Sequence, residues 1–311
     1  MNNSDDFYFV LTGFPGLPEK FYSVVGMTIF LVYVTSLCAN DIVIGLVILK
    51  GHLHQPMYII IANLAISDLL YDTSTLPKMI SKYWSGDGKL SFTACFIQTP
   101  IVHTLNCVDS LTITLMAIDR YVAICKPLRY NSIITNPSTI KLCSVTWLVC
   151  FAIGMFVASW ALPLPYCGPN KVRAFYCSLS KVAILSCADS SQVRRNGFYA
   201  GITMHMGPLS FIILSYLIII ANIWMTTRFK NWQKVLNTCI THWFVITLFY
   251  IPRIVEYSYN QYELFPHPDL NVLIVCLYTY VPHFCSPIIF CLRTNAIRKT
   301  LGKIVQKLIN G

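Results

Sequence analysis

The stretch LMAIDRYVAICKPLRY, residues 115–130, sets a charged pair, Asp119 and Arg120, together with Tyr121 against an apolar helical run. Charged side chains are costly inside the hydrocarbon of a bilayer, and they concentrate where a span ends or where another group pairs with them. The triplet therefore predicts the end of a membrane-crossing helix, provided that the rest of the chain has the pattern of a membrane protein.

Composition places the whole chain in a membrane. Of its 311 residues 55% are apolar and only 12% are charged, and the mean hydropathy of +0.58 is too high for an ordinary water-soluble domain. Seven apolar stretches are close to or longer than the roughly 20 residues that cross about 30 Å of hydrocarbon. They lie at 22–49, 57–80, 94–118, 138–162, 197–226, 239–260 and 269–292. We predict an all-α membrane protein, a seven-transmembrane helix bundle whose second, sixth and seventh helices are interrupted by Asp68, Asp72, Arg253, Glu256 and His283.

The two ends of such a chain lie on opposite faces of the membrane, because seven is an odd number. With the N-terminus outside, a modest majority of the basic residues lies inside, as the positive-inside rule requires. The start of the chain, MNNSDDFYF, is an independent argument, since the glycosylation sequon at Asn2 can be used only outside. We therefore predict an extracellular segment at 1–21, the transmembrane domain at 22–292 and a cytoplasmic part at 293–311.

The tail predicts a short amphipathic eighth helix on the inner leaflet. In NAIRKTLGKIVQKLI, residues 295–309, one face is apolar and the rest carries basic residues. The apolar residues are Ile297, Leu301, Ile304, Val305 and Leu308, and the basic ones are Arg298, Lys299, Lys303 and Lys307. The net charge of +10 suits an inner face that meets anionic membrane lipid and acidic partners. We do not expect nucleic acid to be a partner. We expect the first span to act as its own insertion signal, because no cleavable signal peptide precedes it.

The cysteines sort by position. Thirteen is an odd number, so at least one thiol is free or pairs outside the chain. Eight lie within or beside the spans, where small apolar packing is expected: Cys38, Cys107, Cys143, Cys150, Cys239, Cys276, Cys285 and Cys291. Cys125 is on the reducing side, where acylation is an alternative to packing. Cys95, Cys167, Cys177 and Cys187 face the oxidising side and allow two disulfides in three connectivities. The polar stretch 163–195, which holds three of them, predicts a lid.

Five segments together resemble the signature segments of odorant receptors, within the rhodopsin-like G-protein-coupled receptors. They are LHQPMYIIIANLAISDLL (53–70), MAIDRYVAICKPLRY (116–130), LSYLIII (214–220), KVLNTCITH (234–242) and PIIFCLRTNAIRKTL (287–301). The likeness runs in order from LTGFPGL (11–17) to about residue 301. LTGFPGL and HTLNCVDS (103–110) are most similar to the class I, or fish-like, branch.

The resemblance implies an activation switch at the inner end of the third helix. Arg120 would contact the G protein in the active state, and Asp119 would hold it when the receptor is idle. An Arg120 that only reaches lipid phosphate is the alternative. The positions of Tyr121, Tyr216, Lys234, His242 and Pro287 belong to the same switch. The family motif Asn-Pro-x-x-Tyr is Ser286-Pro287-Ile288-Ile289-Phe290 here, so two of its side-chain hydrogen bonds are weakened.

A ligand pocket is expected in the outer half of the bundle. His103, Asn106, Cys107 and Ser110 share one face of a helix, and burying His103 or Asn106 unpaired costs about 1–3 kcal/mol each, so a ligand or a neighbouring helix must satisfy them. Pro252 should kink the sixth helix. Arg253 either meets an acidic ligand group or pairs with Glu256. The other predicted pocket residues are Tyr199, Gly201, Met204, Tyr250, Ile254, Tyr257, Cys276 and Thr279.

Two further site predictions follow from the resemblance. Asp68 and Asp109 are intramembrane acids whose positions are similar to those of a sodium pocket, with a protonated, hydrogen-bonded pair as the alternative. The family pattern pairs Cys95 with Cys177 and Cys167 with Cys187. Apart from an allosteric Na⁺ at that pocket, no cofactor is expected.

The resemblance implies an odorant receptor in the plasma membrane that binds small-molecule odorants. It would activate a heterotrimeric G protein of the stimulatory olfactory type and raise cAMP. A non-olfactory chemosensory receptor is the nearest alternative. A transporter or channel is the alternative from another class, and it predicts broken helices and a second topological half, which the hydropathy pattern lacks. No enzyme is expected, since no nucleophile, base and oxyanion site converge.

Overall fold

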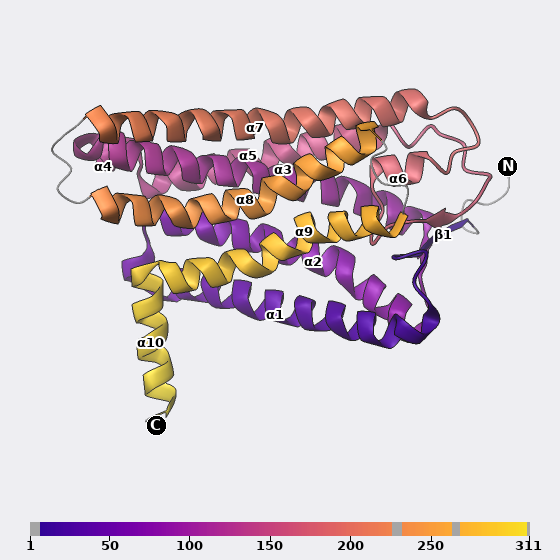
Figure 1. The fold of residues 1–311 in the computed structure, drawn as a ribbon, viewed down its shortest axis with the longest axis horizontal. Helices are drawn as coiled ribbons and strands as arrows, with labels where there is room; N and C mark the ends of the chain where they lie inside the picture. The colour runs from indigo at the N-terminus through magenta and orange to yellow at the C-terminus, as the bar shows by residue number, and fades with distance from the viewer. Residues whose placement is uncertain (1–6, 226–231, 263–267, 310–311) are drawn as a thin grey trace.

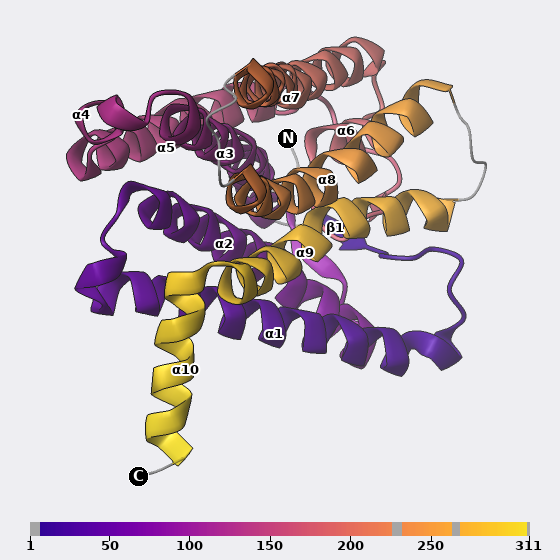
Figure 2. The same ribbon diagram turned by 60° about the vertical axis from the view of Figure 1, so that its left-hand side comes forward.

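The computed structural model describes residues 7–225, 232–262 and 268–309. Its long helices lie side by side along one axis (Figures 1 and 2). Within the described ranges the seven that match the predicted spans are α1 (Tyr22–Leu49), α2 (Pro56–Ser85), α3 (Phe92–Cys125), α5 (Asn136–Ser159), α7 (Ser191–Met225), α8 (Trp232–Tyr262) and α9 (Pro268–Arg293). They are followed by α10 (Asn295–Ile309). The predicted all-α fold with an eighth helix is confirmed.

Among the residues that the structure describes, six helices are long and apolar enough, by length and composition alone, to cross a membrane. The seventh, α8, is 31 residues long and carries Arg253 and Glu256, and the side chains of its first residues lie outside the described part of the chain. Arg253 is turned into the bundle and is only 3% exposed. A charged residue facing the interior is compatible with a span, whereas one facing lipid is not.

Short elements connect the long helices. At the end of the bundle that the sequence predicts to be the inner one, η2 (Gly51–Leu53) follows α1, and η3 (Pro127–Arg129) and α4 (Tyr130–Ile133) follow α3. At the other end lie η1 (Glu19–Phe21), α6 (Leu179–Ala183) and the strands β1 (Tyr8–Leu11), β2 (Lys89–Ser91) and β3 (Lys171–Val172). Gly86 ends α2 with φ of 75°, a conformation that a residue with a Cβ rarely adopts.

The centre of the bundle is α3, which packs against α2, α5, α7 and α8. Its contact with α5 is close because Gly154 has no side chain: a Cβ there would lie 2.8 Å from the carbonyl oxygen of Pro100. On the outward faces of α5 and α7, large apolar side chains such as Phe151 and Leu217 are exposed. An apolar surface of this kind is what a lipid environment requires.

The N-terminal segment has a structure that hydropathy did not predict. Strand β1 is the middle strand of a small sheet, antiparallel to β2 and parallel to β3. Phe9 and Leu11 on β1 are completely buried against the outer ends of the helices. The segment therefore covers the same end of the bundle as the disulfide-bonded stretch 163–195.

Helix α10 runs across the direction of the long helices (Figure 1). Ile297 on its apolar face is buried against Leu46 and Leu53, and Leu301 and Ile304 pack on the same cluster. Arg298, Lys299 and Lys303 are exposed. The predicted amphipathic helix is thus present, and part of its apolar face packs on the bundle itself rather than on lipid.

Candidate functional site

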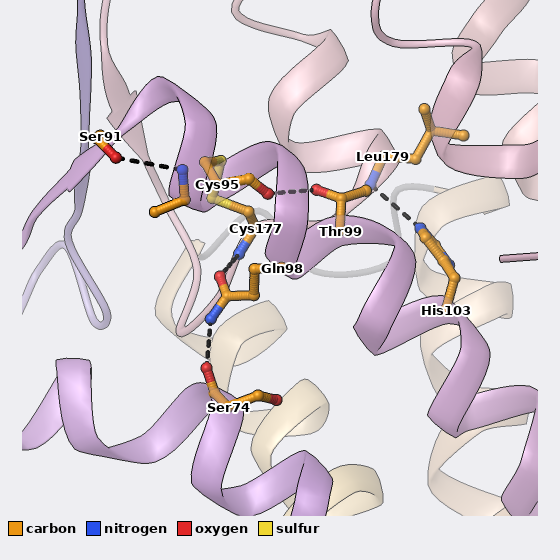
Figure 3. Close-up of a disulfide and its surroundings, with 9 residues drawn as sticks. Ser74, Ser91, Cys95, Gln98, Thr99, His103, Cys177 and Leu179 are labelled. Atoms are coloured by element: carbon orange, nitrogen blue, oxygen red, sulfur yellow. Dashed lines mark hydrogen bonds between the residues drawn. A yellow bond between two sulfur atoms is a disulfide. The ribbon is translucent and has the colours of Figure 1, made fainter. Parts of the chain in front are cut away.

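Two disulfides fix the lid, and they have the pairing that the resemblance implied, Cys95 with Cys177 and Cys167 with Cys187. Figure 3 shows the first of them, between the start of α3 and the lid. The Cys177 N–H donates to Gln98 Oε1 at 2.8 Å, and Gln98 Nε2 donates to the carbonyl of Ser74 at 2.7 Å. The lid, α3 and α2 are therefore joined within one turn of α3.

His103 supports the lid from below. Its Nε2 accepts the backbone N–H of Leu179, the first residue of α6, at 3.3 Å (Figure 3). An imidazole nitrogen that accepts this bond carries no proton of its own. In this structure His103 satisfies an otherwise free N–H at the start of a helix, one of the two roles considered from the sequence. Its contact with a ligand stays a prediction.

The lid reaches into the bundle through aromatic side chains. Phe175 and Tyr176 are buried, and the Tyr176 ring lies 5.8 Å from the ring of Tyr71 on α2. Burial raises the pKa of the Tyr176 hydroxyl, so this buried group is neutral at physiological pH. Burial lowers the pKa of Lys181 on α6, and the nearby Glu256 opposes that change. The outer end of the bundle is thus closed by protein groups.

Beneath the lid, Arg253 is the centre of a polar cluster between three helices. Its Nη2 donates to Asn106 Oδ1 on α3 at 2.7 Å, and its Nη1 contacts His205 Nε2 on α7. His205 Nδ1 is 2.7 Å from the carbonyl of Gly201, so Nδ1 carries the proton and Nε2 accepts from the guanidinium. The partners that the structure shows for the Nη atoms are thus protein amide and imidazole groups.

One donor of Arg253 is left over. Its Nε is buried and has no hydrogen-bond partner in the part of the chain that the structure describes. The guanidinium carbon lies 4.0 Å from the ring centre of Phe249 and 5.0 Å from that of Tyr278, so aromatic faces hold the group in place. A fixed, buried cation with an unused N–H can bind an acceptor atom of a small molecule.

A second polar contact lies one turn deeper. The hydroxyls of Ser110 on α3 and Tyr250 on α8 are 2.9 Å apart, and Ser110 also donates to the carbonyl of Met204 on α7 at 3.2 Å. The same three helices are therefore joined at two levels, by Arg253 and by Ser110.

The remaining predicted pocket residues do not all lie around Arg253. Cys107 points to α5, with its Sγ 2.8 Å from that of Cys150, and Met204 packs beside this pair. Tyr199 and Ile254 are 59% and 41% exposed, so they are not enclosed by the bundle in this structure, and their contact with a ligand stays a prediction. On α9, Cys276 is partly buried and Thr279 completely so.

The side chain of Tyr257 lies outside the described residues. Sequence reasoning missed His205, Phe249 and Tyr278. A histidine within the apolar span 197–226 is the signal that would have identified His205.

An acidic cluster lies in the middle of the bundle. His283 on α9 is surrounded by three carboxylates: Nδ1 is 2.8 Å from Asp72 Oδ1, and Nε2 is 3.5 Å from Asp68 Oδ1 and 3.6 Å from Asp109 Oδ2. Ser36 on α1 donates to the other oxygen of Asp72 at 2.6 Å. All of these side chains are buried. The sequence predicted Asp68 and Asp109 together but not His283 or Asp72 with them.

The donor set fits a sodium ion only in part. Asp68, Asp109 and His283 have ligand atoms within 4.8 Å of one another, and neither oxygen of Asp109 has a hydrogen-bond partner among the described residues. Carboxylate oxygens suit hard cations, whereas an imidazole nitrogen suits softer ones. His283, which is positively charged only when it is protonated, lies between the acids at the place that a cation would take.

At the inner end, Asp119 and Arg120 form the expected pair, with Oδ2 and Nε 3.7 Å apart. Tyr130 on α4 donates to the other oxygen of Asp119 at 2.7 Å. Burial, together with this hydrogen bond, raises the pKa of the Tyr130 hydroxyl. Tyr130 lies within the segment 116–130 that carried the resemblance, but its role could not be deduced from sequence.

Several buried polar atoms near Arg120 have no hydrogen-bond partner within the described residues. They are Arg120 Nε and Nη2, Tyr216 Oη and His242 Nε2. The charge of Arg120 is close enough to act on both Tyr216 and His242. Tyr121 packs on the adjoining apolar cluster. The side chain of Lys234 is outside the described part of the chain.

The altered motif of α9 is packed into the bundle. Ser286 and Phe290, on either side of Pro287, are both buried, and Phe290 belongs to the apolar core. Asn40 on α1 donates to the carbonyl of His283 at 3.1 Å, which links α1 to α9 just before this motif. Packing of the Phe290 ring thus takes the place of the hydroxyl contact that a tyrosine would make.

Comparison with known proteins agrees with this architecture and these motifs. The profile of the olfactory receptor family matches residues 29–308. Olfactory receptor 6B1 of Homo sapiens is 34% identical over 95% of this chain and 94% of its own. Olfactory receptor 12D2 of Homo sapiens is 32% identical over 99% and 100%. The fold is similar to that of squid rhodopsin, with a TM-score of 0.73 and 17% identity over 94% of this chain and 87% of the rhodopsin. The chain belongs to the olfactory receptor family.

Proposed function

We propose that this receptor binds a small odorant with a hydrogen-bond acceptor beneath the lid, at Arg253. The observation that carries the proposal is the buried Nε of Arg253, a donor without a partner in the described part of the chain. Leaving such a donor unsatisfied costs about 1–3 kcal/mol, which a ligand oxygen would recover. Asn106 and His103 on α3 and Tyr250 on α8 would complete the polar side of the site, with Thr279 and Cys276 on α9.

The position of Arg253 on α8 allows ligand binding to change the packing of this helix. Arg253 directly follows Pro252, and α8 changes direction in its middle part (Figure 1). Proline removes one helical hydrogen bond and bends a helix at that point. A ligand that draws Arg253 away from Asn106 or His205 would change how the outer half of α8 packs on α3 and α7.

We infer that the response at the inner end is release of Arg120. The unpartnered atoms of Arg120, Tyr216 and His242 are polar groups that an inserted segment of a G protein would satisfy. Ligand binding would favour the conformation in which α8 moves outward and Arg120 leaves Asp119. The expected partner is a heterotrimeric G protein of the stimulatory olfactory type, and the expected output is cAMP.

The proposed location is the plasma membrane, with the N-terminus outside. The sequon at Asn2, the disulfides at the lid end and the basic residues at the other end support this orientation. Asn2 lies outside the described residues. Glycosidase treatment of the receptor from intact cells should increase its mobility on a gel, and Asn2→Gln should abolish the shift. Absence of a glycan on wild-type receptor at the cell surface would contradict the orientation.

The function is tested by a cAMP reporter in cells that express the receptor, screened against volatile acids, esters, ketones, alcohols and hydrocarbons. Arg120→Ala should abolish the response at normal surface expression, and Arg253→Ala should weaken it for ligands with an acceptor. Arg194→Ala, an exposed arginine on α7, is the matched control and should respond as wild type. A well-expressed receptor that gave no cAMP but passed ions or solute would support the transporter alternative instead.

A further inference from the structure

A pocket separate from both sites lies between α10 and the end of α1. Its volume is about 440 Å³, and it opens at the end of the bundle where α10 leaves it. The residues that line it are Lys50, His52, Ala296, Lys299, Thr300, Lys303 and Ile304. Neither the odorant site nor the contacts of Arg120 include any of these residues.

The lining is strongly basic. Lys50 comes from the α1 side, and Lys299 and Lys303 come from α10, with no acidic residue among the lining groups. In the described part of the chain none of these three ammonium groups takes part in an ion pair. Three cations that converge on one pocket without a counter-charge repel one another, and a polyanion would neutralise them.

The two walls of the pocket are held at a fixed spacing. His52 Nε2 lies 2.9 Å from Thr300 Oγ1, and Thr300 donates its own hydroxyl proton to the carbonyl of Ala296 at 2.7 Å. The Thr300 oxygen therefore accepts the His52 Nε2–H. Behind this contact, Ile297 is completely buried against Leu53 of η2. The basic groups of α1 and α10 are thus part of a preformed site and do not belong to separate flexible tails.

The surroundings of the pocket favour a ligand with an apolar tail. Ile48 and Leu49, which directly precede Lys50 on α1, are 65% and 77% exposed. Apolar side chains exposed next to a basic pocket at the end of a transmembrane helix are suited to acyl chains below a charged headgroup. A soluble phosphate would use the lysines alone, without an acyl chain beside Ile48 and Leu49.

We propose that the pocket binds the headgroup of an anionic inner-leaflet phospholipid that carries phosphomonoesters. Three lysines match a headgroup with several negative charges better than phosphatidylserine, whose net charge is a single negative one. The inference rests on the proposed orientation of the chain, since anionic lipids are concentrated on the cytoplasmic leaflet. It is independent of the odorant and of Arg253.

The test is binding of a fluorescent short-chain phosphatidylinositol bisphosphate to purified full-length receptor in neutral-lipid nanodiscs. Saturable binding to wild type is expected, and the paired change Lys299→Ala with Lys303→Ala should weaken it by about tenfold or more. The matched control is Lys126→Ala with Lys141→Ala, which removes the same charge from exposed positions outside the pocket and should change affinity by less than about twofold. The charge-conserving pair Lys299→Arg with Lys303→Arg should bind nearly as wild type, which separates loss of the site from loss of folding.

Competition arms identify the source of the phosphate. Phosphatidylserine and free inositol trisphosphate should each compete at least about tenfold more weakly than the phosphatidylinositol bisphosphate lipid. Equal loss of affinity in the pocket pair and the control pair would overturn the proposal, because it would show only general attraction to a basic surface. Free inositol trisphosphate that competed as well as the lipid would also overturn it, in favour of a soluble phosphate site.

Discussion

The hydroxyl of Tyr130 donates a hydrogen bond of 2.7 Å to Asp119, the carboxylate that also pairs with Arg120. One oxygen of Asp119 is thus held by α4, which follows the third span, and the other faces the arginine of the switch. Any change that frees this carboxylate alters how firmly it restrains Arg120.

Tyr130→Phe should therefore raise basal cAMP. A hydrogen bond to a carboxylate is worth about 1.5–3 kcal/mol, so its loss is expected to increase the active population by roughly tenfold or more. Basal reporter signal, divided by surface expression, measures this. Ser132→Ala removes another hydrogen bond of the same short helix, to the Arg129 carbonyl, and should leave the basal signal unchanged. Basal activity of Tyr130→Phe equal to that of Ser132→Ala would exclude the restraint.

Arg253→Met should reduce potency for ligands that have an acceptor group. The methionine side chain can still pack near Phe249 and Tyr278 but donates nothing. We expect the concentration for half-maximal response to rise by about 10-fold to 100-fold for an active ketone or ester, the range for a lost charged hydrogen bond. Arg253→Lys keeps a positive charge and should therefore lose less potency than Arg253→Met. Equal losses for an active hydrocarbon of the same size would point to misfolding or packing instead of the missing donor.

His283→Ala should make the receptor sensitive to sodium. In wild type the imidazole lies between Asp68 and Asp109, so exchange of sodium for N-methylglucamine should change agonist potency by less than about twofold. The smaller side chain leaves space beside two carboxylates, and potency should then change by about fivefold or more. Binding of labelled agonist to isolated membranes measures both. A wild-type receptor with strong sodium dependence would show that the ion enters beside His283.

Removal of one disulfide should lower the stability of the receptor more than removal of the other. Cys95 and Cys177 are 82 residues apart, and Cys167 and Cys187 are 20 apart. On the loop-entropy relation these bridges contribute about 4.5 and about 3.3 kcal/mol respectively. Cys95→Ser with Cys177→Ser should lower the thermal stability of purified receptor more than the other pair does. Cys38→Ser, at an exposed free thiol, is the control for cysteine replacement. A larger loss for the Cys167 pair would mean that the lid's local contacts matter more than loop length.

Much of the fold could be predicted from the sequence because its signals are local. The predicted span 22–49 coincides with α1 (Tyr22–Leu49), since a run of apolar residues long enough to cross the bilayer depends on composition alone. The ends of α3 were predicted less well: the helix covers Phe92–Cys125, beyond the apolar core at 94–118, because helices continue past the hydrocarbon where their hydrogen bonds are still made. Strand β1 was not predicted, because its partners β2 and β3 come from distant parts of the chain.

The candidate site was predicted only in outline. Arg253 and Asn106 were identified from their polarity within apolar helices, but the face that a helix presents depends on how its neighbours rotate it. For that reason Tyr199 and Ile254 proved to be exposed, and His205 was missed although it contacts Arg253.

The sequence by itself determined the number of spans, the amphipathic tail and the family, because hydrophobic length, helical periodicity and ordered motifs are properties of contiguous residues. Only the tertiary structure decided which charged groups meet. Asn106 and Arg253 are 147 residues apart in sequence, and Asp72 and His283 are 211 apart, yet each pair forms a hydrogen bond inside the bundle. Buried polar groups must find partners, and in a bundle of helices those partners are set by packing between helices and not by position along the chain.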